Sequence, residues 1–199
     1  MNILKMTLSL IFLGLFATNG VSQDRPNVLV VYYSKQGHTK TMAETVADGA
    51  RSVENVQVKL LSVADADSAD VLAADAIILG SPVYNANVAP PVLEFLKTWP
   101  FEGAPLRNKI GAAFVTAGGM SAGEELTQMN ILHAMLIFGM IVVGGPDWTQ
   151  AFGASGMTVE PPFDRQPEPG FVEAYFLKKG EALGRRVAEL TVRLRSGEE

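Results

Sequence analysis

The sequence predicts a doubly wound α/β sandwich, in which helices cover both faces of a mostly parallel sheet. Short apolar runs recur along the chain, and segments of helical spacing separate them. Near-continuous apolar runs are typical of strands that are covered on both faces. Their alternation with helical segments favours parallel strands joined by crossover helices. A length of 199 residues with 48% hydrophobic residues favours one domain with a substantial core.

Five apolar runs are the predicted strands, and each has the length of an ordinary strand. They are residues 28–33, 56–63, 76–80, 110–116 and 140–144. Residues 149–170 are rich in Gly and Pro, so we expect a long surface loop there.

Four segments carry apolar residues at intervals of three or four, as helices do. These residues are Met42, Val46, Ala50 and Val53; Val92, Phe95 and Leu96; Leu126, Met129, His133, Leu136 and Ile137; and Tyr175, Phe176, Leu183, Val187, Leu190 and Leu194. Pro90 and Pro91 suit the first turn of the second helix.

Residues 1–22 have the composition of a signal peptide, and residues 23–199 are the predicted domain. Lys5 precedes an uncharged, mostly apolar stretch at 6–17 that is shorter than a membrane span, and Gly20 and Ser22 suit a cut after residue 22. An exported periplasmic or secreted protein is therefore expected. The alternatives are an uncleaved leader that anchors the chain to the membrane, or a buried first strand.

Composition excludes several kinds of function. Cysteine is absent, which excludes disulfides, thiol catalysis and Cys-ligated zinc, and two histidines argue against a His-rich metal centre. The net charge is −5, and removal of Lys5 with the leader makes it −6. Without long basic clusters, nucleic acid is not an expected partner, and a membrane is expected only through an uncleaved leader.

In a doubly wound sheet, ligands bind at the carboxyl ends of the strands, so the segments after the first, third and fourth strands matter most. The first is Ser34-Lys35-Gln36-Gly37-His38-Thr39. It combines hydroxyls, a conformationally free glycine and a helix N-terminus, a combination that suits a small phosphate monoester. A capped helix preceded by a polar turn is the alternative.

The second and third segments also have unusual compositions. Residues 80–87 read GSPVYNAN, in which an aromatic ring can lie against a planar ligand and amides can bind its edge. Residues 116–123 read TAGGMSAG, and their small side chains let the backbone approach a ligand closely. A packed loop with a structural tyrosine and a flexible glycine-rich loop are the respective alternatives.

Three stretches carry a resemblance to a known family: VLVVYYSKQGHTKTMAETVADGA, AADAIILGSPVYNANVAPPVLEFL and KIGAAFVTAGGMSAGEELT. The chain resembles the flavodoxin-like superfamily, and most closely the WrbA-like NAD(P)H:quinone oxidoreductases and related flavodoxin family proteins, over about residues 27 to 195. The resemblance implies a five-stranded parallel sheet of order 2-1-3-4-5, one FMN per subunit and a dimer or tetramer.

The resemblance also implies which residues hold FMN. Residues of the first segment would wrap the phosphate, those of the second would lie beside the isoalloxazine ring, and those of the third would touch its polar edge and the ribityl chain. The residues are Ser34, Lys35, Gln36, Gly37, His38 and Thr39; Val83, Tyr84, Asn85 and Asn87; and Thr116, Ala117, Gly118 and Gly119.

The chain also departs from the pattern of these quinone reductases. A histidine commonly precedes the fifth strand in them, but Ile137 or Phe138 aligns there, and we expect His133 to pack in the core or at an interface. Phe101, Trp99 and Trp148 are candidates for the substrate pocket, and structural packing is the alternative for each.

The expected function is an FMN-dependent oxidoreductase that reduces a quinone or related acceptor by two-electron transfer through flavin N5, with NAD(P)H as donor. No side chain is expected to act as nucleophile, and no metal site is expected. One aromatic at the second segment and a mild charge favour this enzyme over a flavodoxin-type single-electron carrier. A flavodoxin-like module without catalysis is the third hypothesis. Export conflicts with NAD(P)H as donor, because NAD(P)H is a cytoplasmic reductant.

Overall fold

The computed structural model describes residues 25–161 and 168–197. The predicted leader, residues 1–22, lies outside the described residues. The elements in chain order are β1 (Asn27–Tyr32), α1 (His38–Arg51), β2 (Gln57–Ser62), α2 (Ser68–Ala73), β3 (Ala76–Tyr84), β4 (Asn87–Val88), α3 (Pro90–Lys97), β5 (Ile110–Ala117), α4 (Glu124–Ile137), β6 (Ile141–Val142), the 3₁₀ helix η1 (Trp148–Gln150), β7 (Ala154–Met157) and α5 (Ala174–Ser196).

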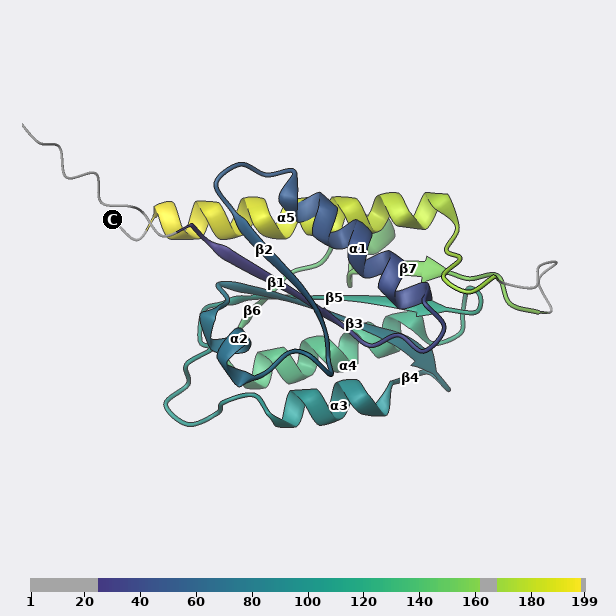
Figure 1. Cartoon of the computed structure of the whole chain (residues 1–199), viewed down its shortest axis with the longest axis horizontal. Helices are drawn as coiled ribbons and strands as arrows, with labels where there is room; N and C mark the ends of the chain where they lie inside the picture. Colours follow the sequence, from purple (N-terminus) through teal and green to yellow (C-terminus); the bar gives the residue numbers. More distant parts are fainter. Residues whose placement is uncertain (1–24, 162–167, 198–199) are drawn as a thin grey trace, which may run out of the picture.

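The sheet has the predicted doubly wound topology. Its path is β2-β1-β3-β5-β6, and the pairings along this path are parallel. Chain order reverses between β1 and β3, which is where such folds bind ligands. The carboxyl ends of the strands lie at the right of Figure 1, together with the start of α1 and with β7.

The fifth position of the sheet differs from the expectation of one continuous strand. The two residues of β6 pair with Ile110 and Gly111, at the start of β5, whereas β7 pairs with residues 114–117 at its end. The prediction of a loop over 149–170 is therefore wrong for β7 and η1. Within residues 25–161 and 168–197 the sheet has seven strands, because this position is divided and β4 adds a short antiparallel pairing to β3.

Helices form a layer on each face of the sheet (Figure 1). One core cluster joins α1 and α5 to one sheet face through residues such as Val30, Met42 and Leu183, and a second lies toward α3 and α4. The helices α1 and α5 touch along their backbones, since a Cβ added at Gly184 would lie 1.9 Å from the carbonyl oxygen of Val46. Among the described residues, no helix is both long and apolar enough to span a membrane.

Helix α4 buries a different face from the one that its apolar spacing predicts. Its buried residues are Thr127, Gln128, Ile131, Leu132 and Met135. The predicted stripe is partly exposed, and its His133 is an exposed residue, so of the two expected places for it the core is wrong and an interface stays a prediction. Because apolar residues lie both on the buried side of α4, such as Ile131 and Met135, and on its exposed side, such as Ile137, spacing alone does not select the packed face. Hydrogen bonds satisfy its buried polar side chains, such as that from Gln128 Nε2 to Ser155 Oγ at 3.2 Å.

Candidate functional site

The loop after β1 and the carboxyl-terminal ends of β3 and β5 meet in one cavity of about 160 Å³ at the carboxyl edge of the sheet. Thirteen residues line this cavity, which we call the strand-end cavity. They are Ser34, Lys35, Gln36, His38, Thr39, Pro82, Val83, Tyr84, Thr116, Ala117, Gly118, Thr158 and Glu160. The topology thus gathers most of the predicted cofactor residues in one place.

The loop between β1 and α1 forms a tight turn at Gly37. Its φ of +93° lies in the left-handed region, which favours glycine. The backbone N–H of Gly37 donates to Ser34 Oγ at 3.1 Å, which closes the turn. Among the described residues no side chain caps the start of α1, and its first turn holds no acidic residue. The first N–H groups of α1 therefore have no side-chain acceptor in the described part of the chain, and they lie at the positive end of the helix dipole.

A segment that is distant in sequence packs against this loop and fixes it. The N–H of Gly170 donates to the Gln36 carbonyl oxygen at 2.9 Å, and Thr41 Oγ1 donates to the Gly170 carbonyl oxygen at 2.8 Å. His38 Nδ1 lies 2.7 Å from the Phe171 carbonyl oxygen. A carbonyl only accepts, so Nδ1 carries a proton and a neutral ring keeps its lone pair on Nε2.

The loop also bonds directly to the end of β5. Thr39 Oγ1 and Thr116 Oγ1 are 2.7 Å apart, and both side chains are buried. Two hydroxyls that share one hydrogen bond keep a further donor and further lone pairs. This contact holds the first and third predicted segments side by side.

The second segment is a hairpin that presents Tyr84. The strands β3 and β4 pair through Val83–Val88 and Tyr84–Asn87, and Asn85 and Ala86 form the two-residue turn with φ of 52° and 61°. Positive φ at both positions is typical of a type I′ turn. Tyr84 is 38% exposed, and desolvation, with the nearby Tyr33 and the negative charge of Glu160, raises the pKa of its phenol.

Several predicted residues lie outside the lining of the strand-end cavity. Asn85 and Asn87 line a neighbouring open depression with Val83 and Tyr84, and Asn87 Nδ2 donates to the Asn85 carbonyl oxygen at 2.8 Å. Gly37 and Gly119 do not line the cavity, although each adjoins a residue that does, and Gly119 is buried.

The substrate-pocket candidates are not brought to the strand-end cavity within this chain. Phe101 is 63% exposed and lines a different cavity with Arg107 and Phe138, which precede β5 and β6 and so lie at the amino edge of the sheet. Trp148, in η1, is 88% exposed and is not among the residues that line the strand-end cavity.

Sequence reasoning missed three residues of the strand-end cavity, namely Pro82, Thr158 and Glu160. Thr158 and Glu160 directly follow β7, which reads Ala-Ser-Gly-Met inside the stretch assigned to a loop. These small residues resemble a loop in composition. The available signal was the pair of polar residues two apart after Met157.

Known proteins resemble the chain in sequence. The family model for NADPH-dependent FMN reductase matches residues 26–154. A flavodoxin from Aquifex aeolicus is 38% identical over 126 residues, which cover 61% of this chain and 66% of the relative. An NAD(P)H dehydrogenase (quinone) from Azorhizobium caulinodans is 37% identical over 142 residues, which cover 60% of this chain and 70% of the relative. The matches thus span about two thirds of each relative's length.

Solved structures resemble the chain in fold. The WrbA-like flavodoxin from Agrobacterium tumefaciens has a TM-score of 0.68 at 23% identity, and the match covers 84% of this chain and 98% of that one. A flavodoxin from the domain Archaea has a TM-score of 0.63 at 26% identity and is covered to 99%, with 83% of this chain matched. The chain therefore has the flavodoxin-like fold.

Proposed function

The chain belongs to the family of NADPH-dependent FMN reductases, which are FMN-binding oxidoreductases, and from this premise we propose that it reduces a quinone or related acceptor with electrons from NAD(P)H through one bound FMN. The observation that carries the proposal is the convergence of three strand-end segments, distant in sequence, on the strand-end cavity. An NAD(P)H dehydrogenase (quinone) among the relatives supports this choice of donor and acceptor.

The residues of the first loop fit the phosphate of FMN. The uncapped start of α1 offers N–H groups, and Ser34, Thr39 and Thr116 offer hydroxyls. Lys35 supplies a positive charge at the rim, and the glycine turn leaves room for an anion above it. In this proposal Ser34, Lys35, Gln36, Gly37, His38 and Thr39 hold the phosphate.

The second and third segments fit the remainder of the cofactor. Tyr84 presents a half-exposed ring where the strand-end cavity meets the neighbouring depression, and Val83, Asn85 and Asn87 surround it. Thr116, Ala117 and Gly118 line the cavity, Gly119 follows them directly, and this segment would bring backbone groups to the cofactor. Bound FMN would supply two-electron transfer through ring atom N5, and the chain's own residues bind it, orient it and keep water from one face.

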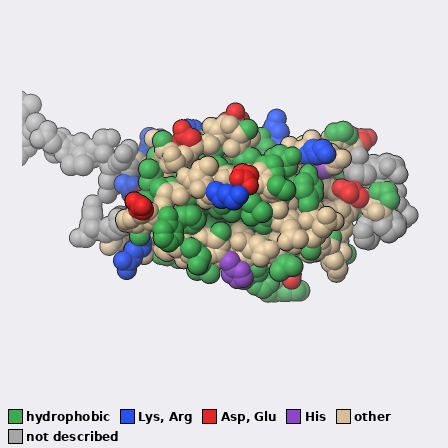
Figure 2. Space-filling model, turned by 90° about the horizontal axis from the view of Figure 1, so that it is seen from below, with side chains coloured by type: hydrophobic (Ala, Val, Ile, Leu, Met, Phe, Trp, Pro, Cys, Tyr) green, Lys and Arg blue, Asp and Glu red, His purple; other side chains and the backbone are tan. Residues whose placement is uncertain are grey.

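Self-association into a dimer or tetramer is part of the proposal. Residues 126–146 contain no Asp, Glu, Lys or Arg, and Leu126, Leu136 and Ile137 of α4 are exposed. Figure 2 looks onto the α3 and α4 side, where hydrophobic and uncharged surface predominates. Exposed apolar residues that group on one face mark an interaction site, which favours a second copy on this face. His133, Phe101 and Trp148 would then be candidates for contacts between copies.

Export is a further part of the proposal, with residues 1–22 removed or retained as a membrane anchor. The apolar stretch at 6–17 supports it. Outside the cytoplasm the chain must acquire FMN after crossing, and its reductant would have to be an exported carrier or a membrane quinol if NAD(P)H is absent.

A single-electron carrier is the alternative function, because a flavodoxin stands among the similar sequences. The discriminating experiment is an FMN titration of the purified chain by quenching of flavin fluorescence, followed by addition of NADPH or NADH without oxygen and then of a quinone.

Tight binding, rapid loss of the flavin absorbance and its return on adding quinone are the expected results. Binding without reduction by either nicotinamide would overturn the assigned donor and favour the carrier. Absence of FMN binding would overturn the whole proposal and leave a flavodoxin-like module without catalysis. Fractionation of the producing cells, with the intact mass of the chain, tests the export proposal.

A further inference from the structure

The chain inserts one extra residue where β7 runs past the end of β5. The N–H of Thr158 donates to the Ala117 carbonyl oxygen at 2.9 Å, and the N–H of Glu160 donates to the Gly118 carbonyl oxygen at 2.8 Å. The two N–H donors are two residues apart, but their carbonyl acceptors belong to adjacent residues. In a regular parallel ladder, donors and acceptors advance by the same number of residues along their strands. Val159 is the extra residue, and the local structure is a β-bulge.

The bulge is strained at Val159. Its φ of 56° lies in the left-handed region, which is a genuine outlier for a β-branched residue. The hydrogen bonds on both sides hold it, together with a bond from Thr158 Oγ1 to the Ala117 carbonyl oxygen at 3.2 Å. Bulges beside binding sites redirect a side chain, and strain of this kind persists where the surroundings enforce it.

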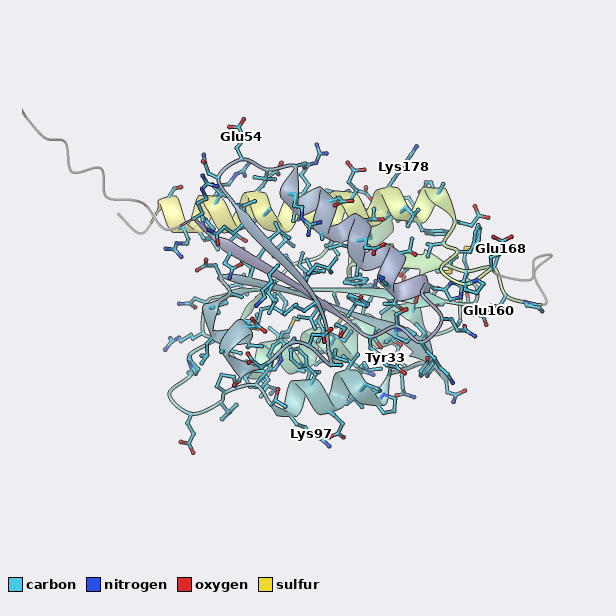
Figure 3. The ribbon with its side chains drawn as sticks, viewed as in Figure 1. Tyr33, Glu54, Lys97, Glu160, Glu168 and Lys178 are labelled. Atoms are coloured by element: carbon cyan, nitrogen blue, oxygen red, sulfur yellow. The ribbon has the colours of Figure 1, made fainter. Side chains whose placement is uncertain are left out.

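The redirected side chain is that of Glu160, which lies flat against Gly118. A Cβ added at Gly118 would be 3.1 Å from Glu160 Oε2 and 3.3 Å from its Cβ and Cδ. Thr158 Oγ1 also lies 3.1 Å from Glu160 Oε1, so its one hydroxyl hydrogen is shared between this carboxylate and the Ala117 carbonyl oxygen. Glu160 therefore forms part of the wall of the strand-end cavity (Figure 3).

The negative charge of the Glu160 carboxylate lies at the wall of the strand-end cavity, where it disfavours other negative charges. Among the residues that the structure describes, no Lys or Arg forms an ion pair with Glu160. Its negative charge contributes to the raised pKa of Tyr84, so it disfavours an anion at the ring of Tyr84. An anion on a cofactor ring beside Tyr84 would be disfavoured in the same way.

We propose that Glu160 is an electrostatic tuning residue, which makes bound FMN a stronger reductant by disfavouring the anionic reduced ring relative to the uncharged oxidised ring. Two electrons and one proton convert the oxidised ring into this anion, and in the assigned reaction NAD(P)H supplies them together as a hydride. Charge near the flavin ring is one means by which proteins set its electronics. This inference rests on the proposed binding of FMN.

The test compares Glu160→Gln with Glu54→Gln in the full chain. Glu54 is exposed and lies at the far end of the molecule from Glu160, so its variant removes the same charge from a distant place (Figure 3). Affinities for oxidised FMN and for anaerobically reduced FMN are measured by titration. Glu160→Gln should raise the affinity for reduced relative to oxidised FMN about tenfold, as a unit charge roughly 10 Å away does at an effective dielectric constant of about 20. Glu54→Gln should leave the ratio unchanged.

A second readout needs no cofactor. The phenol of Tyr84 is titrated by ultraviolet absorbance in the FMN-free chain, with Tyr84→Phe identifying its contribution. Glu160→Gln should lower the pKa of Tyr84 toward its ordinary value. An unchanged phenol titration, or bound FMN with an unchanged affinity ratio, would overturn the role of Glu160. If the wild-type chain binds no FMN, the proposed function fails and this inference falls with it.

Discussion

Gly37 is the residue on which the proposed phosphate site depends most directly. Its φ is +93°, and a Cβ there would lie 3.1 Å from the backbone N and Cα of Gly170. Any other residue at this position is therefore destabilising for two reasons. Its backbone would be strained in the left-handed region, and its Cβ would press against the backbone of Gly170.

We predict that Gly37→Val abolishes FMN binding, with an affinity at least about 100-fold weaker, and lowers the free energy of unfolding by about 2–3 kcal/mol. Gly103→Val is the matched control. Gly103 has φ of +77°, but no atom lies within 4 Å of an added Cβ, so strain alone acts there. Fluorescence titration and urea unfolding measure both quantities. Unchanged FMN affinity in Gly37→Val would remove this loop from the site.

Helix α4 is the element whose exposed face the fold leaves unexplained. Its inner face is satisfied by packing and by bonds such as that from Thr127 Oγ1 to the Gly123 carbonyl oxygen at 2.9 Å. Its outer face ends in Ile137, which is 72% exposed. Removing apolar groups of this size from water lowers the free energy, and a second copy of the chain offers the matching surface.

We predict that Ile137→Lys converts a dimer or tetramer into monomers, because an unpaired ammonium group in an apolar interface is costly to desolvate. The dissociation constant should rise about 100-fold or more. Light scattering after size-exclusion chromatography gives the mass, with Leu194→Lys on α5 as the control at another partly exposed leucine. A wild-type monomer at micromolar concentration would show that self-association is wrong.

At the scale of the whole molecule, the site links segments from distant parts of the chain. The 34–39 loop, the 83–88 hairpin, the end of β5 and residues 158–160 all contact the strand-end cavity or adjoin it. A ligand that binds all of them stabilises the folded chain as a unit, because the unfolded chain has no such cavity.

We predict that FMN at about 100 times its dissociation constant adds about 2.7 kcal/mol to the free energy of unfolding and raises Tm by about 5–10 °C. Riboflavin lacks the phosphate, so at equal concentration it should raise Tm much less. Differential scanning fluorimetry, recorded at a wavelength where flavin does not emit, measures the shift in Tm. Equal shifts with FMN and riboflavin would contradict a phosphate site in the 34–39 loop.

The sequence by itself determined the layered fold and the place of the site. Buried strands such as β1 and β5 must be apolar along their length, and α1 and α3 must be apolar on one face, so hydrophobic burial leaves a local pattern in the chain. The glycine turn after β1 is likewise a local feature.

Only the tertiary structure decided the rest. The strand β7 is made of small residues and exists because it pairs with β5, about forty positions earlier in the chain. That pairing, with the bulge at Val159, brings Glu160 to the cavity. The packed face of α4 was likewise decided by its neighbours, because apolar residues lie on both its buried and its exposed side. Contacts between distant segments leave no periodic signal, so the sequence alone predicts neither their existence nor their direction.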